Sequence, residues 1–138
     1  MQMFTMKHLL SKVVALALVA VLFVSGCSAT PGTEILTGKY QQDAQIVVDV
    51  MREAIETPQD AANQREVRDN AISVMEAFGS RYSANKYSGL QSYTSLRTVF
   101  NTLGSYYRSE RLRPVRQDKL ERVSSELKQV ELALKRSR

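Results

Sequence analysis

Four segments after residue 38 carry apolar residues at every third or fourth position, with polar residues between them. This spacing is typical of amphipathic α-helices that bury one face. No segment shows sustained alternation of apolar and polar residues, so no strand is predicted. Because the connections are short, the pattern predicts an all-α fold, an antiparallel up-down-up-down four-helix bundle over residues 39–138. The four apolar stripes are Ala44, Val47, Val48, Met51 and Ile55; Val67, Ala71, Val74, Phe78 and Tyr82; Tyr93, Leu96, Val99, Phe100, Leu103 and Tyr107; and Leu120, Val123, Leu127, Val130 and Leu134.

Local signals indicate where the first two helices begin and end. The first helix is expected over 40–56, because Pro58 disfavours helical geometry in the residue before it. Residues 63–66 have the sequence Asn-Gln-Arg-Glu, which fits a capping box that opens a helix. The second helix is therefore expected from Asn63 to about Tyr82.

The third and fourth helices have weaker start signals. Residues 83–89 form a polar loop, and the third helix is expected to begin with a capping box over 88–91 or a cap at Ser92. Within that helix, Gly104 would let a neighbouring backbone approach closely. Pro114 predicts the start of the fourth helix, because its fixed φ suits the first helical position.

The first 26 residues have a different pattern. They hold Lys7 and Lys12, an unbroken apolar run over 13–24, the small Ser25 and Gly26, and then Cys27 as the next residue. This order is typical of a bacterial lipoprotein signal, and it predicts cleavage before Cys27 and lipid attachment to its sulfur. One alternative is an uncleaved membrane helix, although the apolar run of 12 residues is short against the roughly 20 that a span needs. A soluble exported protein with a free thiol is the other.

Residues 27–38 are small and polar, and they are interrupted by Pro31, Gly32 and Gly38. This composition predicts a flexible tether that reaches on the order of 17–20 Å and lets a folded head stand off the membrane. A disordered tail that only provides spacing is the alternative. The predicted organisation is thus a signal over 1–26, a lipidated tether over 27–38 and a bundle over 39–138, with Met6 as a possible true start.

The composition excludes several kinds of chemistry. The only histidine, His8, and both signal lysines lie before Cys27, so the expected mature chain has no histidine and no second cysteine. Histidine-based catalysis, a histidine-ligated metal, a disulfide and a covalent c-type haem are therefore excluded. The sequence argues against an enzyme, and we expect no cofactor and no metal site. A carboxylate-ligated metal carrier stays an alternative, although the acids Asp43, Glu53, Glu56, Asp60, Glu66, Asp69 and Glu76 fit solvated helix faces better.

Charge and surface residues suggest what the chain binds. The mildly positive balance fits an acidic partner surface or anionic lipid headgroups, and the expected compartment excludes nucleic acid. A basic loop between the last two helices is the candidate docking surface, because Tyr and Arg are enriched in interface cores. The alternative is a solvated loop with Tyr107 in the core, and Tyr82, Tyr87 and Tyr93 are expected at the core edge. The candidate docking residues are Tyr106, Tyr107, Arg108, Arg111, Arg113 and Arg116, with Lys119 beside them.

Several motifs together resemble one known family. They are Thr37-Gly38-Lys39-Tyr40, the stretch Ser88-Gly89-Leu90-Gln91-Ser92-Tyr93-Thr94-Ser95-Leu96, the run from Asn101 to Tyr107, the pair Arg113-Pro114, and the tail from Leu127 to Arg136. They are similar to the photosystem II assembly and repair lipoproteins, the twenty-seventh member of the Psb series. The likeness covers essentially the whole mature chain, and Cys27 favours the cyanobacterial form. One departure is Arg116, which stands where the family often has a second proline.

The resemblance implies a lipid-anchored four-helix bundle on the lumenal side of the thylakoid membrane. The family binds photosystem II assembly intermediates transiently, chiefly through the lumenal loop of the smaller chlorophyll-binding inner-antenna subunit. It is thought to keep the oxygen-evolving site open while manganese is loaded and to hinder premature docking of extrinsic proteins. We expect a monomeric, non-catalytic assembly factor of this kind. The alternative is a generic cell-envelope lipoprotein with a structural or ligand-sensing role.

Overall fold

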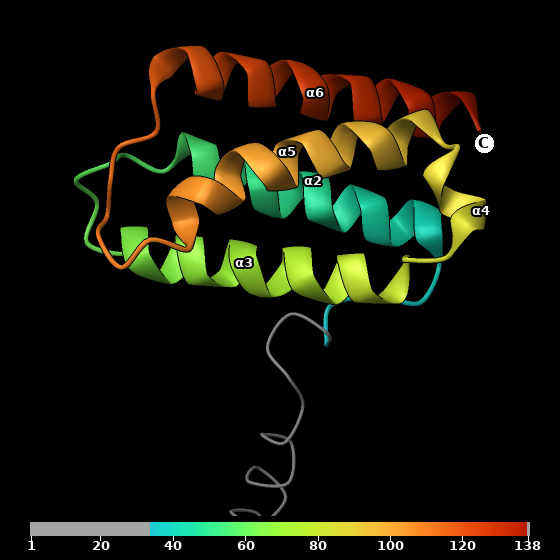
Figure 1. Ribbon diagram of the computed structural model, residues 1–138, viewed down its shortest axis with the longest axis horizontal. Coiled ribbons are helices and arrows are strands. Elements are labelled where there is room, and N and C mark those ends of the chain that lie inside the picture. The colour runs from blue at the N-terminus through green and yellow to red at the C-terminus, as the bar shows by residue number, and fades with distance from the viewer. Residues whose placement is uncertain (1–33, 138) are drawn as a thin grey trace, which may run out of the picture. The chain divides into compact units, whose positions relative to one another are not determined.

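The computed structural model describes residues 34–137, which form an all-helical bundle (Figure 1). Its long helices run antiparallel in chain order, as the sequence predicted. Beside them, a single short helix, α4, lies in the connection that was expected to be an irregular polar loop. The elements are α2 (Tyr40–Glu56), α3 (Gln64–Arg81), α4 (Asn85–Ser88), α5 (Gln91–Tyr107) and α6 (Gln117–Arg136).

The apolar stripes meet in one core. Val47, Val74, Val99 and Leu127, one from each long helix, have no exposed surface. Four members of the predicted stripes pack at the edge of the core and are only partly buried: Ile55, Tyr93, Phe100 and Leu120. Helix α2 packs on α3 and α6, and α5 packs mainly on α6, while the contact between α3 and α5 is the smallest of the four. The weaker α3–α5 contact leaves a groove between these two helices.

The bundle has two dissimilar ends (Figure 1). We call one the α4 end: it holds α4, the first residues of α2 and α5, and the last residues of α3 and α6. We call the other the loop end: it holds the connections over 57–63 and 108–116. Among residues 34–137, no helix is both long and apolar enough to span a bilayer. The signal over 1–26 and the lipidation site Cys27 lie outside the described residues.

Two predicted helix starts are wrong in their chemistry. The Asn63 side chain makes no capping hydrogen bond, because its ψ of 12° is not the extended conformation in which a cap reaches back to the helix amides. Helix α5 begins after Leu90, again with no side-chain cap. The hydroxyl of Ser88 bonds the Asn85 carbonyl inside α4, and the hydroxyl of Ser92 is paired with Tyr40 instead.

The start of the fourth helix is also displaced. Helix α6 begins at Gln117 with Arg116 as its cap residue, not at Pro114. The reason is Val115, which is buried and holds the preceding chain extended against the core. Gly104 also differs from expectation, because the side chain of Arg108, four residues on, covers it instead of a neighbouring backbone. A Cβ at position 104 would collide with Arg108 Nη1.

The folded head begins before the first helix. Leu36 is buried in the core, and the next two residues bond to α2, although the sequence prediction assigned 27–38 to the tether. Gly38 has a φ of +88°, a conformation that glycine adopts without strain. This turn brings the amides of Thr37 and Gly38 to the same carboxylate, that of Asp43.

Candidate docking surface

At the loop end, the buried residue Arg68 on α3 organises the predicted basic loop. Its Nε donates to Gln64 Oε1 at 2.8 Å, and its Nη2 donates to Gln59 Oε1 and to the Arg113 carbonyl, both at 2.8 Å. The guanidinium also lies 5.0 Å from the centroid of the Tyr107 ring. No carboxylate neutralises it, and Nη1 has no hydrogen-bond partner among the residues that the structure describes.

These contacts attach the 108–116 connection to α3. Besides the bond from Arg68 to the Arg113 carbonyl, Arg65 Nη2 donates to the Glu110 carbonyl at 3.1 Å. The guanidinium of Arg113 stacks over Tyr106, 5.6 Å from the ring centroid. The loop is therefore held in one conformation, and the side chains of Arg108, Arg111, Arg113 and Arg116 are exposed on it.

The tyrosines of the predicted surface have different environments. Tyr106 is half-buried and remains accessible, whereas Tyr107 is 6% exposed and belongs to the core. Burial raises the pKa of Tyr107 to about 12, although the positive charge of Arg68 opposes the shift. Tyr107 therefore supports the loop through Arg68 and is not available for direct docking. Arg116 is also partly neutralised, because its Nε lies 3.1 Å from the carboxylate of Asp118.

The outward face of α5 extends this surface, and sequence reasoning missed it. From residue 77 to residue 109 the chain contains no acidic residue, although the other three long helices carry several. Arg97, Asn101 and Ser105 are exposed at successive helical turns of α5. The sequence carries this feature as a run without Asp or Glu. The apolar stripes describe only the opposite, buried face of the helix.

A groove of about 380 Å³ lies between α3 and α5, with the polar residues Arg97 and Asn101 at its rim. Two half-buried aromatic side chains, Tyr93 and Phe100, contribute to its wall beside the core residues Phe78 and Leu96. Aromatic residues and arginine with few acids form the composition that protein interfaces favour. The α5 face has no acid, and the basic loop that follows it has one, Glu110; we call the two together the α5 surface.

Asp43 departs most from the sequence prediction, which placed it on a solvated face. It is fully buried at the α4 end. Its Oδ1 accepts hydrogen bonds from the Thr37 amide at 2.6 Å and the Thr37 hydroxyl at 2.8 Å. Its Oδ2 accepts from the Gly38 amide at 3.0 Å and from the Tyr82 hydroxyl at 2.5 Å, and Arg81 Nη1 lies 3.6 Å away.

These partners decide the protonation state of the buried carboxyl. Burial alone would raise the pKa of Asp43, but the hydrogen bonds from Tyr82, Thr37 and Gly38 outweigh it and leave the pKa below its ordinary value. Burial and the bond to Asp43 conversely raise the pKa of Tyr82. Asp43 is therefore an ionised structural anchor.

An aromatic cluster surrounds this anchor. Tyr40 stacks on Tyr87 with the ring centroids 5.1 Å apart, and Tyr82 meets both rings edge-on. Tyr82 is buried in the core, whereas Tyr87 and Tyr93 lie at its edge as predicted. Within residues 34–137, no three Asp, Glu, His or Cys side chains are grouped in a way that would hold a metal ion.

Together, the fold and the α5 surface define a small helical protein whose exposed features suit binding to a partner protein. The comparisons with known proteins are consistent with this class. A family model described as Photosystem II Pbs27 matches residues 3–134, so the chain belongs to that family. The resemblance found in the sequence motifs is thereby confirmed.

Two curated relatives match nearly the whole chain. The Photosystem II lipoprotein Psb27 of Synechocystis sp. is 37% identical over 132 residues, covering 95% of this chain and 96% of that protein. The Photosystem II assembly factor lipoprotein Psb27 of Thermosynechococcus vestitus is 31% identical over 132 residues, covering 95% and 97%. The solution structure of Psb27 from cyanobacterial photosystem II is similar with a TM-score of 0.71 and 37% identity, covering 81% of this chain and 96% of that one.

Proposed function

We propose that this chain is a lipid-anchored assembly factor of photosystem II that acts by binding, without catalysis. The observation that carries the proposal is its membership of the Photosystem II Pbs27 family over residues 3–134. A relative matched over 95% of this chain is itself named a photosystem II assembly factor lipoprotein. The α5 surface supports a binding role, because its residues are those that protein interfaces favour.

The proposed client is the large lumenal loop of the smaller chlorophyll-binding inner-antenna subunit in assembly intermediates. We propose that the α5 surface receives it, with Tyr106, Arg108, Arg111, Arg113 and Arg116 at the loop end. Arginine side chains bind carboxylates through paired hydrogen bonds, so an acidic client segment suits them. The unpaired Arg68 Nη1 lies beneath these residues and adds to the positive potential.

The proposed mechanism is occupation of space. A head bound to the lumenal loop keeps the oxygen-evolving site accessible while manganese is loaded and hinders early docking of extrinsic proteins. The lipid on Cys27 confines the head to the lumenal face of the thylakoid membrane and raises its effective concentration near the client. A single acyl chain anchors only marginally, so the anchor needs two or three chains.

Purification of the tagged full chain from photosynthetic membranes tests the function. We expect chlorophyll-binding subunits of unfinished photosystem II to copurify with it, and we expect Cys27→Ser to lower the yield without altering the fold. Copurification with unrelated envelope proteins and no chlorophyll-protein would contradict the proposal and favour a generic envelope lipoprotein. Mass spectrometry of Cys27 measures lipidation independently.

Charge variants test the proposed docking surface. Arg108→Glu/Arg111→Glu should weaken client binding at least tenfold and reduce its salt dependence, because each exposed cation contributes through screened attraction. Arg122→Glu/Lys128→Glu makes the same charge change on the exposed face of α6 and is the matched control. Equal losses in the two variants would remove the α5 surface from the proposal.

A further inference from the structure

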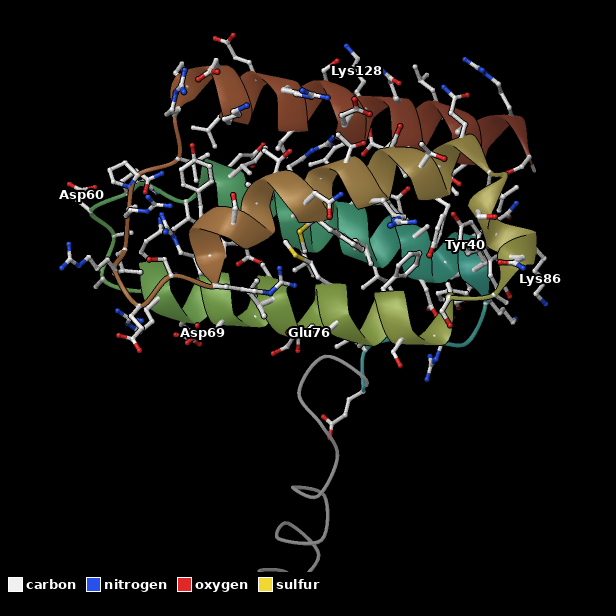
Figure 2. All side chains as sticks on the ribbon, in the orientation of Figure 1. Tyr40, Asp60, Asp69, Glu76, Lys86 and Lys128 are labelled. Carbon is white, nitrogen blue, oxygen red and sulfur yellow. The ribbon has the colours of Figure 1, made fainter. Side chains whose placement is uncertain are left out.

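The α4 end carries cations with almost no exposed acid. Five described residues there are basic: Lys39, Arg81, Lys86, Lys135 and Arg136. The acids of this end are Glu34, which is exposed, and Asp43, which is buried. Glu131, farther back on α6, is paired with Arg52 at 2.9 Å. Figure 2 shows Lys86 and Tyr40 at this end, whereas Asp60 lies at the loop end.

The loop end is charged differently. Its exposed cations, among them Arg65, Arg111 and Arg116, alternate with acids such as Glu56, Asp60, Glu66, Glu110 and Asp118. The α4 end is therefore a concentrated positive surface, whereas the loop end as a whole is mixed. Opposite charges attract most strongly where one sign is clustered, so the α4 end is the stronger attractor for an extended anionic surface.

Exposed apolar side chains gather at the same end. Within residues 34–137 the large apolar residues left exposed are Ile35, Leu90, Leu112 and Leu132. Leu90 is 40% exposed at the start of α5, and Leu132 is 45% exposed near the end of α6. Ile35 is 43% exposed two residues before Thr37, which Asp43 holds at this end. Only Leu112 lies at the loop end.

A groove joins the charged and the apolar residues. It has a volume of about 330 Å³ and is lined by Leu90 and Arg136 together with Tyr40 and Ala133. The side-chain amide of Gln41 donates through Nε2 to the Ser137 carbonyl at 3.0 Å. This bond fixes the end of α6 against the start of α2. Helices α2 and α5 begin at this end without side-chain caps, so their free backbone amides add positive potential.

The chain itself brings this end close to a membrane if Cys27 is lipidated. The buried Leu36 lies nine positions after Cys27, and nine residues extend at most about 32 Å. Clustered lysine and arginine next to exposed leucine and isoleucine form the combination that binds anionic membrane surfaces. We propose that the α4 end is a second membrane contact, which docks on anionic lipid headgroups and orients the head.

This orientation has a consequence for the proposed client. With the α4 end on the lipid, the long axis of the bundle stands away from the membrane and the loop end is presented outward. Helix α5 has 17 residues, so its far end lies about 25 Å farther out than its start. The α5 surface then faces along the membrane toward a neighbouring membrane protein. The membrane contact thus deepens the proposed function and rests on it only for the anchor at Cys27.

Vesicle sedimentation tests the contact without the anchor. A chain that begins at residue 28 keeps the entire core, and a similar chain of matching extent was solved in solution, so this chain folds on its own. We expect it to bind vesicles with equal phosphatidylglycerol and phosphatidylcholine at low salt, and not vesicles of phosphatidylcholine alone. Binding should fall about fivefold for each cation removed from the α4 end. Equal partition onto both kinds of vesicle would overturn the proposal.

Matched variants locate the contact on the molecule. Lys39→Gln/Lys86→Gln should lower vesicle binding about 25-fold, from about fivefold per cation. Arg122→Gln/Lys128→Gln, which removes two exposed cations from the middle of α6, should lower it less than threefold. Circular dichroism and thermal unfolding confirm that both variants are folded. Equal losses would indicate general attraction with no preferred end and would overturn the proposal.

Apolar variants complete the test. Leu90→Gln should weaken binding further, whereas Leu112→Gln at the loop end should leave it unchanged, since both leucines are about equally exposed. A result in which Leu112→Gln alone weakens binding would place the contact at the wrong end and overturn the proposal. Because these measurements use neither the client nor the lipid on Cys27, their failure is distinct from failure of the assembly role. Binding of the α4 end to an acidic peptide but not to vesicles would also overturn it.

Discussion

The two ends of the bundle each bury one charged side chain, and these two residues are satisfied very differently. Asp43 at the α4 end accepts four hydrogen bonds and has a cation nearby. Among residues 34–137, Arg68 at the loop end has three hydrogen bonds to neutral oxygens, no carboxylate partner and one unpaired nitrogen. A buried charge costs several kcal/mol unless it is paired, on the order of the total margin of a small domain.

The difference indicates that the two buried charges have different structural roles. Asp43 fixes the point at which the chain enters the head, and all of its oxygens are occupied. Arg68 fixes the loop that carries the proposed docking residues, and its Nη1 has no hydrogen-bond partner among the described residues. The buried charge of the α4 end is therefore fully paired, whereas the loop end keeps one buried polar atom without a partner among the residues that the structure describes. The following variants test this contrast.

Asp43→Ala should have the largest effect. It removes four hydrogen bonds to a charged group and leaves the buried Tyr82 hydroxyl without its acceptor, so we expect a loss of about 3–5 kcal/mol in the free energy of unfolding. Urea denaturation measures it. Asp69→Asn on the exposed face of α3 is the control and should change stability by less than about 0.5 kcal/mol. A small loss in Asp43→Ala would show that the carboxylate does not anchor this end.

The dependence of stability on pH should show the same difference between Asp43 and Arg68. The folded-state pKa of Asp43 lies below its ordinary value of 3.8, so its contribution is complete above the unfolded-state pKa and is lost as the pH falls through the folded-state pKa. Arg68 does not titrate in that range and contributes equally throughout. We expect Asp43→Asn to flatten the acid limb of stability against pH below about pH 4. An unchanged limb would assign the acid sensitivity to other carboxylates.

Two tyrosines give a smaller, matched comparison. Tyr82→Phe removes a hydrogen bond to the Asp43 carboxylate and should cost about 1.5–3 kcal/mol, the range for bonds to charged groups. Tyr107→Phe at the other end should cost less than about 0.5 kcal/mol, because what Arg68 contacts is the face of the ring. Thermal unfolding distinguishes the two. Equal costs would mean that the hydroxyl of Tyr107 has a role that its ring contact does not explain.

A much smaller change in stability than that of Asp43→Ala is expected at Arg68. Arg68→Met fills similar space and removes the desolvation cost of a buried charge, which offsets the three lost hydrogen bonds to within about 1 kcal/mol. Its effect should appear instead in the 108–116 connection, whose amides should exchange hydrogen faster once the Arg113 carbonyl is released. A loss in Arg68→Met as large as in Asp43→Ala would remove the contrast.

The sequence predicted the helices well because their apolar spacing is a local property that survives packing. Asp43 and Arg68 are harder to recognise, because each has one hydrogen-bond partner in a distant part of the chain. The Tyr82 hydroxyl lies 39 residues from Asp43, and the Arg113 carbonyl lies 45 residues from Arg68. A partial signal existed, since Asp43 precedes Val47 by four positions and Arg68 precedes Ala71 by three, which places both on buried stripes.

The docking surface was also predictable only in part, because some of its features are local in the sequence and others depend on packing. The basic loop is a run of neighbouring cations, which a sequence displays directly, whereas the burial of Tyr107 depends on its packing beneath Arg68. The caps predicted for the third helix are wrong because the hydroxyls of Ser88 and Ser92 are bonded elsewhere, that of Ser92 to Tyr40. Capping patterns identify which residues are able to cap a helix, but tertiary contacts decide which of them do.

The early entry of the chain into the core determines how the head responds to load. A pull on the chain ahead of residue 34 reaches the short strap of Leu36, Thr37 and Gly38 before it reaches any helix. The hydrogen bonds of this strap to Asp43 share the strain, so the first rupture under tension is release of the strap with the helices still folded. Single-molecule stretching from the amino terminus should therefore show a small initial extension of a few residues, which Asp43→Ala abolishes.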